Sequence, residues 1–289
     1  EGCDNNCSFC SIPIMRGLQK SQPIAWNVQE ARRMSEKGAR EILVIAQDST
    51  AYGWDLNPKA SLSDLLIKLN EIDKLEWIRL HYAHPSHLSS KIIACFKNLE
   101  KLVPYIDMPI QHSSNAILKN MRRGLKIEGI KRKIDKLRSV SDDIAIRTSL
   151  IVGFPNESDK DFRELCDFIQ DIRFDRLGVF TYSEEEGTYG KLEYKDNIPL
   201  DIKKERLDEL MRLQMKINLD KNKELINTTQ RVLIDMHTQE GLSIGRTFRD
   251  SPEIDNTVTF NSKLPIGEFY NAKMIEASHY NLVGDVCSE

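Results

Sequence analysis

Apolar and polar residues follow two alternating patterns over the first two thirds of the chain. Short apolar runs are separated by longer segments in which apolar residues recur every three or four positions, and the runs lie at 41–47, 77–83, 105–110, 145–153 and 176–182. Such runs are typical of buried parallel strands, and the amphipathic segments between them, 28–38, 61–72 and 157–172, predict helices. The alternation favours an α/β fold whose parallel sheet is either closed or partly closed into a barrel, or doubly wound.

Polar residues follow each of the predicted strands. They are Gln47 and Asp48, His81 to Pro85, Gln111 and His112, Gly153 to Pro155, and Tyr182 and Ser183. The carboxyl ends of parallel strands meet at one edge of a sheet or barrel, where ligands bind in α/β proteins. We therefore expect these five strand ends to face a common site.

The pattern changes after residue 200. Residues 201–224 have apolar positions at helical spacing and charges elsewhere, which predicts one long connector helix. Beyond this helix, short β-rich pieces separated by Gly, Pro, Asn and Asp predict a small all-β module, a barrel. We therefore expect two domains, residues 1–222 and residues 223–289.

Composition places the chain among ordinary globular proteins. It has 289 residues, of which 40% are hydrophobic and 29% are charged, and its formal net charge is -3. No apolar run is long enough to span a membrane and no basic leader precedes an apolar segment, so we expect a cytoplasmic protein. Cys95 and Cys166 lie in apolar helical patterns and are expected to be buried, unreactive thiols.

Three cysteines stand within the first ten residues, in the pattern Cys-x3-Cys-x2-Cys formed by Cys3, Cys7 and Cys10. Thiolates are the ligands that iron–sulfur clusters select, and this spacing lets three of them converge on one cluster. With no fourth cysteine nearby, one iron of a four-iron cluster stays open for another ligand. The alternative is a zinc or ferredoxin-like site completed by a distant residue such as Cys95.

The cysteine pattern, with Phe9 just before the last cysteine, resembles that of the radical S-adenosylmethionine (radical SAM) enzymes. The resemblance implies an open, partial TIM-like β/α barrel and a 4Fe–4S cluster on Cys3, Cys7 and Cys10. It also implies that S-adenosylmethionine binds the open iron and is cleaved to a 5'-deoxyadenosyl radical, which abstracts a hydrogen atom. Residues expected to line the S-adenosylmethionine pocket, unless they are ordinary barrel packing, are Phe9, Gln47, Gln111, Arg147, Ser149, Gly153 and Tyr182. No catalytic residue is assigned.

Longer stretches narrow this resemblance to the methylthiotransferases, transferases in which the barrel is followed by a β-rich TRAM domain. The stretches are GCDNNCSFCSIPIMRG (2–17) and IVGFPNES (151–158). AQDSTAYG (46–53), DMPIQHSSNAILKNMRRG (107–124) and GRTFRDSPEID (245–255) are similar to the RimO type, which methylthiolates the β-carbon of one aspartate in the twelfth small-subunit ribosomal protein. Two alternatives remain: a MiaB-like tRNA methylthiotransferase, in which GQN and QSGS are expected, and a non-catalytic RNA- or ribosome-binding module with a structural cluster.

Charge bears on the choice of partner. Residues 229–289 contain five Lys or Arg and nine Asp or Glu, a net charge of -4, which favours a basic protein substrate over an RNA backbone. Residues 119–138 contain nine basic and two acidic residues, which leaves contact with nearby ribosomal RNA open. The resemblance further implies an electron donor such as flavodoxin or ferredoxin.

The chain departs from complete methylthiotransferases at its start. Those enzymes have an amino-terminal domain in which three more cysteines hold a second 4Fe–4S cluster, and this sequence begins two residues before Cys3. We therefore expect the first strand of the barrel to be truncated and the amino-terminal domain to be missing. Such a chain is predicted to bind S-adenosylmethionine without completing methylthiolation.

Overall fold

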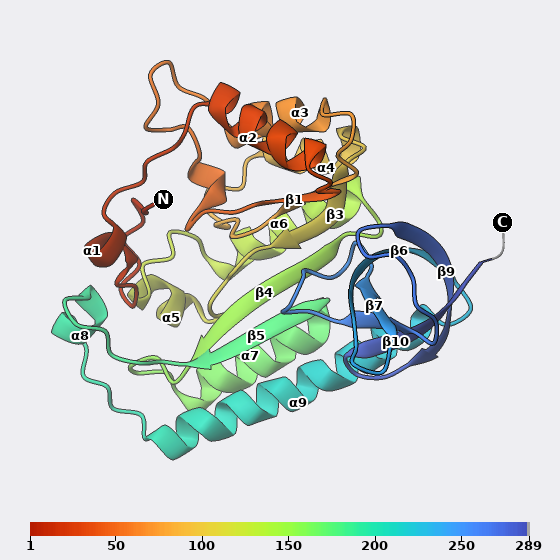
Figure 1. Cartoon of the computed structure of the whole chain (residues 1–289). Helices are drawn as coiled ribbons and strands as arrows, with labels where there is room; N and C mark the ends of the chain where they lie inside the picture. The colour runs from red at the N-terminus through yellow and green to blue at the C-terminus, as the bar shows by residue number, and fades with distance from the viewer. Residues whose placement is uncertain (288–289) are drawn as a thin grey trace.

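The computed structural model describes residues 1–287, which form a parallel β/α sheet followed by a small barrel (Figure 1). The sheet has five strands in the order β1-β2-β3-β4-β5, all parallel, which confirms the predicted α/β fold with a partial barrel. Its strands are β1 (Glu41–Val44), β2 (Trp77–Leu80), β3 (Leu102–Asp107), β4 (Ala145–Val152) and β5 (Arg176–Thr181). Each predicted run contains one of these strands or overlaps it.

Helices cover one face of this sheet. Those of the β/α units are α2 (Ile24–Glu36), α3 (Leu62–Asn70), α4 (Ser90–Asn98), α6 (Ile127–Val140) and α7 (Asp159–Ile172). Shorter helices are α1 (Ile12–Arg16), the 3-10 helix η1 (Ser49–Ala51), α5 (Asn115–Asn120) and α8 (Tyr189–Glu193). Ser61 and Ser158 open α3 and α7 with capping boxes, in which the serine and the third helical residue satisfy each other's backbone N–H groups.

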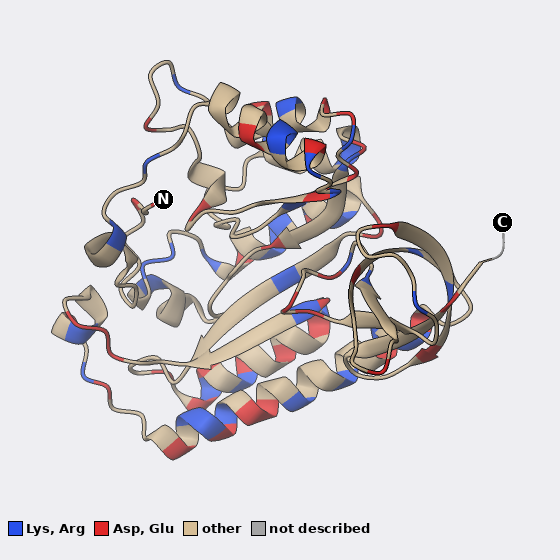
Figure 2. Ribbon diagram, viewed as in Figure 1, with Lys and Arg blue, Asp and Glu red and all other residues tan. Residues whose placement is uncertain are grey.

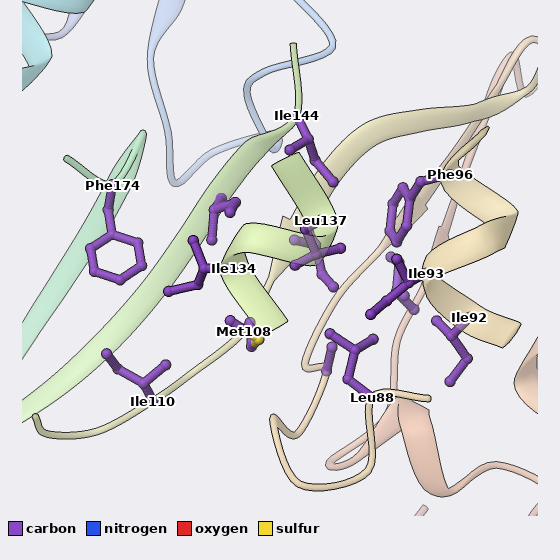
Figure 3. Close-up of a cluster of buried hydrophobic side chains, with 14 of the residues drawn as sticks. Leu88, Ile92, Ile93, Phe96, Met108, Ile110, Ile134, Leu137, Ile144 and Phe174 are labelled. Carbon is purple, nitrogen blue, oxygen red and sulfur yellow. The ribbon is translucent and has the colours of Figure 1, made fainter. Parts of the chain in front are cut away.

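The main hydrophobic core lies between the sheet and these helices. Figure 3 shows Ile134 and Leu137 of α6 and Ile93 and Phe96 of α4 pointing into one cluster. In β4, Thr148 and Leu150 are buried on this side, whereas Arg147 and Ser149 alternate with them and face the other side of the sheet. The inner face of the sheet is therefore available for a ligand.

The long helix α9 (Leu200–Glu224) packs against β5 and α7 and leads to the second domain (Figure 1). Basic and acidic residues are interspersed along α9 and along α7 (Figure 2). Within residues 1–287, no helix is both long enough and apolar enough to cross a lipid bilayer.

The second domain is a closed barrel in the order β10-β8-β7-β6-β9. Its strands are β6 (Thr229–His237), β7 (Ser243–Arg246), β8 (Thr257–Phe260), β9 (Phe269–Ala277) and β10 (Asn281–Val286). Val232, Val258, Phe260, Met274 and Leu282 are among the residues that fill its interior. The barrel predicted from the turn signals is therefore present.

The loop between β7 and β8 enters the inner side of the parallel sheet. Its backbone carbonyl at Phe248 accepts a hydrogen bond of 2.6 Å from Nη1 of Arg79 in β2. Asp255 of the same loop accepts hydrogen bonds from the hydroxyl of Tyr105 at 2.9 Å and from Nε of Arg147 at 3.3 Å. Inward-facing residues of β2, β3 and β4 are thus tied to one loop of the barrel.

Candidate cofactor site

The three amino-terminal cysteines lie on a loop held by backbone hydrogen bonds. The amide of Cys3 donates to the carbonyl of Gly17 at 3.1 Å, and the amide of Cys10 donates to the carbonyl of Cys7 at 3.2 Å. Gly2 adopts a φ of +79°, and a Cβ there would stand 2.2 Å from the carbonyl oxygen of Leu18. Only glycine fits this close approach without a shift of the backbone.

Two of the thiols receive N–H donors from outside the cysteine set. Asn5 donates to Sγ of Cys3 from its backbone at 3.4 Å and from its side chain at 3.3 Å. Nη1 of Arg123, in the loop after α5, donates to Sγ of Cys7 at 3.2 Å. Hydrogen bonds of this kind stabilise thiolates and tune the metal centres they hold.

Asp48 holds the side chain of Asn5 in place by a hydrogen bond. Its Oδ2 accepts a hydrogen bond of 2.8 Å from the side-chain amide of Asn5 and lies 2.6 Å from Nδ1 of His87. Burial acts to raise the pKa of Asp48, but hydrogen bonds from His87, Thr50 and Asn5 outweigh it and lower the pKa to about 2. Asp48 is therefore an ionised, hydrogen-bonded support for the cysteine loop.

Burial raises the pKa of the thiols of Cys3 and Cys10 above the usual value for cysteine. For Cys3, the nearby Asp48 carboxylate and the Cys7 thiol act in the same direction, whereas the N–H groups of Asn5 oppose them. The thiols consequently keep their protons at neutral pH until a metal displaces them.

A cavity of about 770 Å³ opens beside the cysteine loop on the inner side of the sheet. This volume lies within the range of pockets that hold cofactor-sized ligands. The cavity is lined by all three cysteines and by five of the seven residues predicted to bind S-adenosylmethionine, namely Phe9, Gln47, Gln111, Arg147 and Ser149. Sequence positions more than a hundred residues apart thus meet on one surface.

Two residues of the cavity wall have left-handed backbones. Gln111 adopts a φ of +74° and Tyr82 a φ of +52°, although neither is glycine. The amide of Gln111 donates to the carbonyl of Ser149 at 2.9 Å, and its own carbonyl accepts from Ile151 at 2.9 Å. Such backbone strain persists where the surrounding structure enforces it and is concentrated at binding sites.

Arg147 lies on the cavity wall between two protein carboxylates. Its Nη1 is 3.2 Å from Oδ1 of Asp107, and its Nε is 3.3 Å from Oδ1 of Asp255. The sequence predicted Arg147 to line the cofactor pocket unless it is ordinary barrel packing, and the structure provides two carboxylate partners from the protein itself. Its guanidinium is therefore largely satisfied before any ligand enters.

Gly153 and Tyr182 are the two predicted pocket residues that do not line the cavity. A Cβ on Gly153 would stand 2.3 Å from Cγ of Lys203, so glycine admits the lysine stem of α9 at this point. Tyr182 is buried, and its ring packs with Phe154 in the cluster that also supports Phe9. Both positions lie behind the cavity wall, and a role for them in binding the cofactor stays a prediction.

The five predicted strand ends meet only in part. Gln47, His84 and Gln111 reach the cavity, whereas His112 is fully buried with Nε2 3.8 Å from Oε2 of Glu157. Sequence reasoning did not identify Asn5, Arg123 or Phe180 as part of the site, whereas Tyr82 lies within the predicted strand end His81 to Pro85. Arg123 belongs to the basic stretch 119–138, where nothing in the sequence sets it apart from its basic neighbours, and only the fold brings it to Cys7.

The donor set fits a 4Fe–4S cluster with three protein ligands. Cys3, Cys7 and Cys10 share one cavity, and none of the three forms a disulfide. Cys95 lies in α4 within the hydrophobic core on the opposite face of the sheet, so it does not complete a four-cysteine site. The cavity beside the thiols leaves room for a further ligand.

Comparisons with protein families match both parts of the chain. The radical SAM superfamily matches residues 1–169, and the TRAM domain matches residues 226–287. Among solved structures, coproporphyrinogen III oxidase (HemN) from Escherichia coli has a TM-score of 0.55 at 14% identity, covering 94% of this chain and 64% of that chain. SuiB from Streptococcus suis, solved bound to S-adenosylmethionine, has a TM-score of 0.51 at 19% identity, covering 74% and 45%. At these identities the likeness shows the fold alone.

Curated relatives are more similar in sequence. The ribosomal protein uS12 methylthiotransferase RimO of Flavobacterium johnsoniae is 43% identical over 289 residues, covering 99% of this chain and 65% of the relative. The protein of the same name from Acetivibrio thermocellus is 42% identical over 292 residues, covering 100% of this chain and 64% of the relative. The chain thus spans slightly less than two thirds of the length of these relatives.

Proposed function

The chain belongs to the radical SAM superfamily, and on that basis we propose that Cys3, Cys7 and Cys10 hold a 4Fe–4S cluster beside S-adenosylmethionine in the adjoining cavity. Three thiols that line one cavity of about 770 Å³ are the observation that carries this proposal. When bound, the pair of cofactors supplies a 5'-deoxyadenosyl radical that abstracts a hydrogen atom.

In this proposal the residues of the chain bind the cofactors, orient them and shield them. Phe9 offers an aromatic face to the nucleoside, and Gln47, Gln111 and Ser149 offer hydrogen-bonding groups. Gly153 and Tyr182 hold the wall behind them, and Arg147 keeps its ion pairs to Asp107 and Asp255. No side chain of the chain is required as a general base to start a hydrogen abstraction.

We further propose that the complete protein is a ribosomal protein methylthiotransferase of the RimO type, acting on the β-carbon of an aspartate in the small-subunit protein uS12. Identities of 42–43% to relatives of that name, over nearly the whole chain, support this substrate over tRNA. The stretches AQDSTAYG, DMPIQHSSNAILKNMRRG and GRTFRDSPEID support the same choice. An electron donor such as flavodoxin or ferredoxin belongs to the proposal.

Ion pairs at the junction between the domains leave the acidic balance of the second domain unchanged. Asp250, Asp255 and Glu268 pair with Arg176, Arg147 and Arg40 of the parallel-sheet domain. In the opposite sense, Arg231, Arg246 and Arg249 pair with Glu76, Glu41 and Asp143 of that domain. Because the junction takes three acidic and three basic residues, the net charge of -4 over residues 229–289 still supports a basic protein substrate. Contact of the TRAM domain or of the basic stretch 119–138 with ribosomal RNA stays open within the proposal.

Methylthiolation needs a source of sulfur, which in the resembled enzymes is a second 4Fe–4S cluster. The remaining cysteines of the chain do not gather into a second set, because Cys95 lies in α4, Cys166 in α7 and Cys287 next to β10. We therefore expect these 289 residues to bind and cleave S-adenosylmethionine without forming a methylthio product.

The test is anaerobic reconstitution of the chain with iron and sulfide, followed by S-adenosylmethionine and dithionite. We expect a four-iron absorption and EPR spectrum that changes when S-adenosylmethionine is added, and release of 5'-deoxyadenosine detected by mass spectrometry. A chain with Cys7→Ser is the control and should lose both signals. A chain that forms no cluster, or a cluster indifferent to S-adenosylmethionine, would support a non-catalytic module instead.

The substrate is tested separately with the full-length protein. Incubation with uS12 and with tRNA should give a mass increase of one methylthio group on the aspartate of uS12 and leave tRNA unmodified. Modified tRNA with untouched uS12 would replace the proposed substrate by that of a MiaB-like enzyme, without affecting the cluster assignment.

A further inference from the structure

Arg123 differs from every other buried arginine in residues 1–287. Those arginines pair with carboxylates: Arg79 and Arg246 with Glu41, Arg176 with Asp250, and Arg206 with Glu157. Arg123 is 5% exposed, yet within residues 1–287 it forms no ion pair with a carboxylate. A guanidinium stays charged at any physiological pH, and burying it without a counter-charge is strongly unfavourable.

Two hydrogen bonds fix the orientation of the Arg123 guanidinium. Nη1 donates to Sγ of Cys7 at 3.2 Å, and Nη2 donates to the carbonyl of Pro109 at 2.6 Å. The carbonyl of Arg123 accepts a hydrogen bond of 2.7 Å from the hydroxyl of Ser86. A planar guanidinium held at two corners cannot turn away from the thiol without breaking the bond to Pro109.

The missing counter-charge is present when the cysteines are thiolates. A 4Fe–4S core of charge 2+ with three thiolate ligands has a net charge of 1-, and one added electron makes it 2-. A fixed cation beside Cys7 stabilises the reduced state more than the oxidised one, because the attraction grows with the negative charge.

We infer that Arg123 is the counter-ion of the cluster and raises its reduction potential. This rests on the proposed cluster site but not on the proposed substrate. Arg123 acts on the cluster through Cys7, where it supplies a fixed positive charge. It is a positioning residue and does not touch the substrate. The one-electron reduction is supplied by dithionite in the test below and by the electron donor in the cell.

The test compares the reconstituted chain with Arg123→Gln, Arg123→Lys and Arg122→Gln variants in EPR-monitored dithionite titrations without S-adenosylmethionine. Arg122 is the matched control, because it is the adjacent arginine but is exposed, with its guanidinium over the ring of Tyr189. For Arg123→Gln we expect the ratio of reduced to oxidised cluster at a fixed potential to fall at least tenfold, about 59 mV for one electron. Arg123→Lys, which keeps the charge, should recover most of this loss, and Arg122→Gln should match the wild type.

A wild-type potential in Arg123→Gln at full iron content overturns the inference, and so does an equal shift in Arg122→Gln. If Arg123→Gln takes up no cluster, retention by Arg123→Lys supports the counter-ion role, whereas loss from both overturns it. Failure of the wild-type chain to form a cluster is a different outcome, because it contradicts the proposed function itself.

Discussion

Arg176 of β5 and Asp250 of the loop between β7 and β8 form a buried ion pair that joins the parallel sheet to the barrel. Nε of Arg176 donates to Oδ1 of Asp250 at 2.8 Å, and the two side chains are 6% and 2% exposed. Thr247 and Asn256 also donate to the Asp250 carboxylate. The two domains therefore share an electrostatic core as well as an apolar one.

Replacing Asp250 by Asn should destabilise the chain strongly, because it leaves the guanidinium of Arg176 buried without its counter-charge. We expect the free energy of unfolding, measured by urea denaturation, to fall by about 3–5 kcal/mol. Asp143→Asn is the control, since the side chain of Asp143 is 74% exposed in its pair with Arg249 and should cost no more than about 1 kcal/mol. Equal losses in the two variants would show that burial does not set the strength of these pairs.

Substitution of the two glycines that flank the cysteine loop distinguishes the effect of a steric clash from that of backbone strain. Gly2 and Gly17 have φ values of +79° and +74°, but a Cβ would stand 2.2 Å from the carbonyl oxygen of Leu18 in the first case and meet nothing within 4 Å in the second. We expect Gly2→Ala to lose most of the iron bound after reconstitution. Gly17→Ala should keep it, at a cost of about 1–3 kcal/mol for a backbone conformation, φ +74° and ψ -167°, that glycine alone normally adopts. Similar iron contents would contradict this assignment.

His112 should make the fold sensitive to acid. Burial lowers the pKa of His112 from 6.5 to about 3. Between these two pH values the unfolded chain binds more protons than the folded chain, so the free energy of unfolding decreases as the pH falls below about 6.5. Relative to His112→Asn, the wild type should lose roughly 2 kcal/mol of unfolding free energy between pH 7 and pH 5.

The wild type is compared with His112→Asn because the neighbouring Glu157 changes the stability in the opposite direction as the pH changes. Burial raises the pKa of Glu157, 3.8 Å from His112, to about 7, so the stability cost of its ionisation appears as the pH rises from 4.5 to 7. Asn at position 112 can still accept the hydrogen bond that the amide of Ser114 donates to His112 Nδ1 at 2.9 Å. His279→Asn, in the turn between β9 and β10, is the control. Parallel profiles for His112→Asn and wild type would refute the prediction.

The cavity lining predicts which residues matter for S-adenosylmethionine. Gln111 reaches the cavity, whereas Tyr182 lies behind its wall with a hydroxyl that finds no hydrogen-bond partner within residues 1–287. In the reconstituted chain, we expect Gln111→Ala to weaken binding about tenfold, the loss of one or two hydrogen bonds. Tyr182→Phe should leave the dissociation constant within about twofold, as measured by equilibrium dialysis. A larger effect from Tyr182→Phe would move that residue into the binding surface.

Local sequence pattern was sufficient for the strands, the long helix and the cysteine set. The run at 145–153 is a strand because most of its residues are apolar or β-branched, and Ser158 starts a helix because it satisfies a backbone N–H of the first turn. Neither inference needs knowledge of distant contacts. Cys3, Cys7 and Cys10 also follow from local spacing, and the structure places all three on one cavity, whereas their role as cluster ligands stays a proposal.

Contacts between distant segments could not be predicted in the same way. Arg123 meets Cys7 across 116 residues, and Arg147 meets Asp255 across 108 residues. Charge patterning along the chain describes each residue's neighbours in sequence, whereas these pairs depend on how α5 and the barrel loop dock onto the sheet. The acidic total of residues 229–289 likewise does not reveal which of its carboxylates are buried against arginines.

The loop between β7 and β8 also limits how these enzymes can be recombined. Because Asp255 neutralises Arg147 on the wall of the cofactor cavity, the appended barrel is not an independent module that can be exchanged at residue 224. A chimaera that takes its barrel from another protein must bring a carboxylate to this position, or Arg147 keeps Asp107 as its one acidic partner of the two.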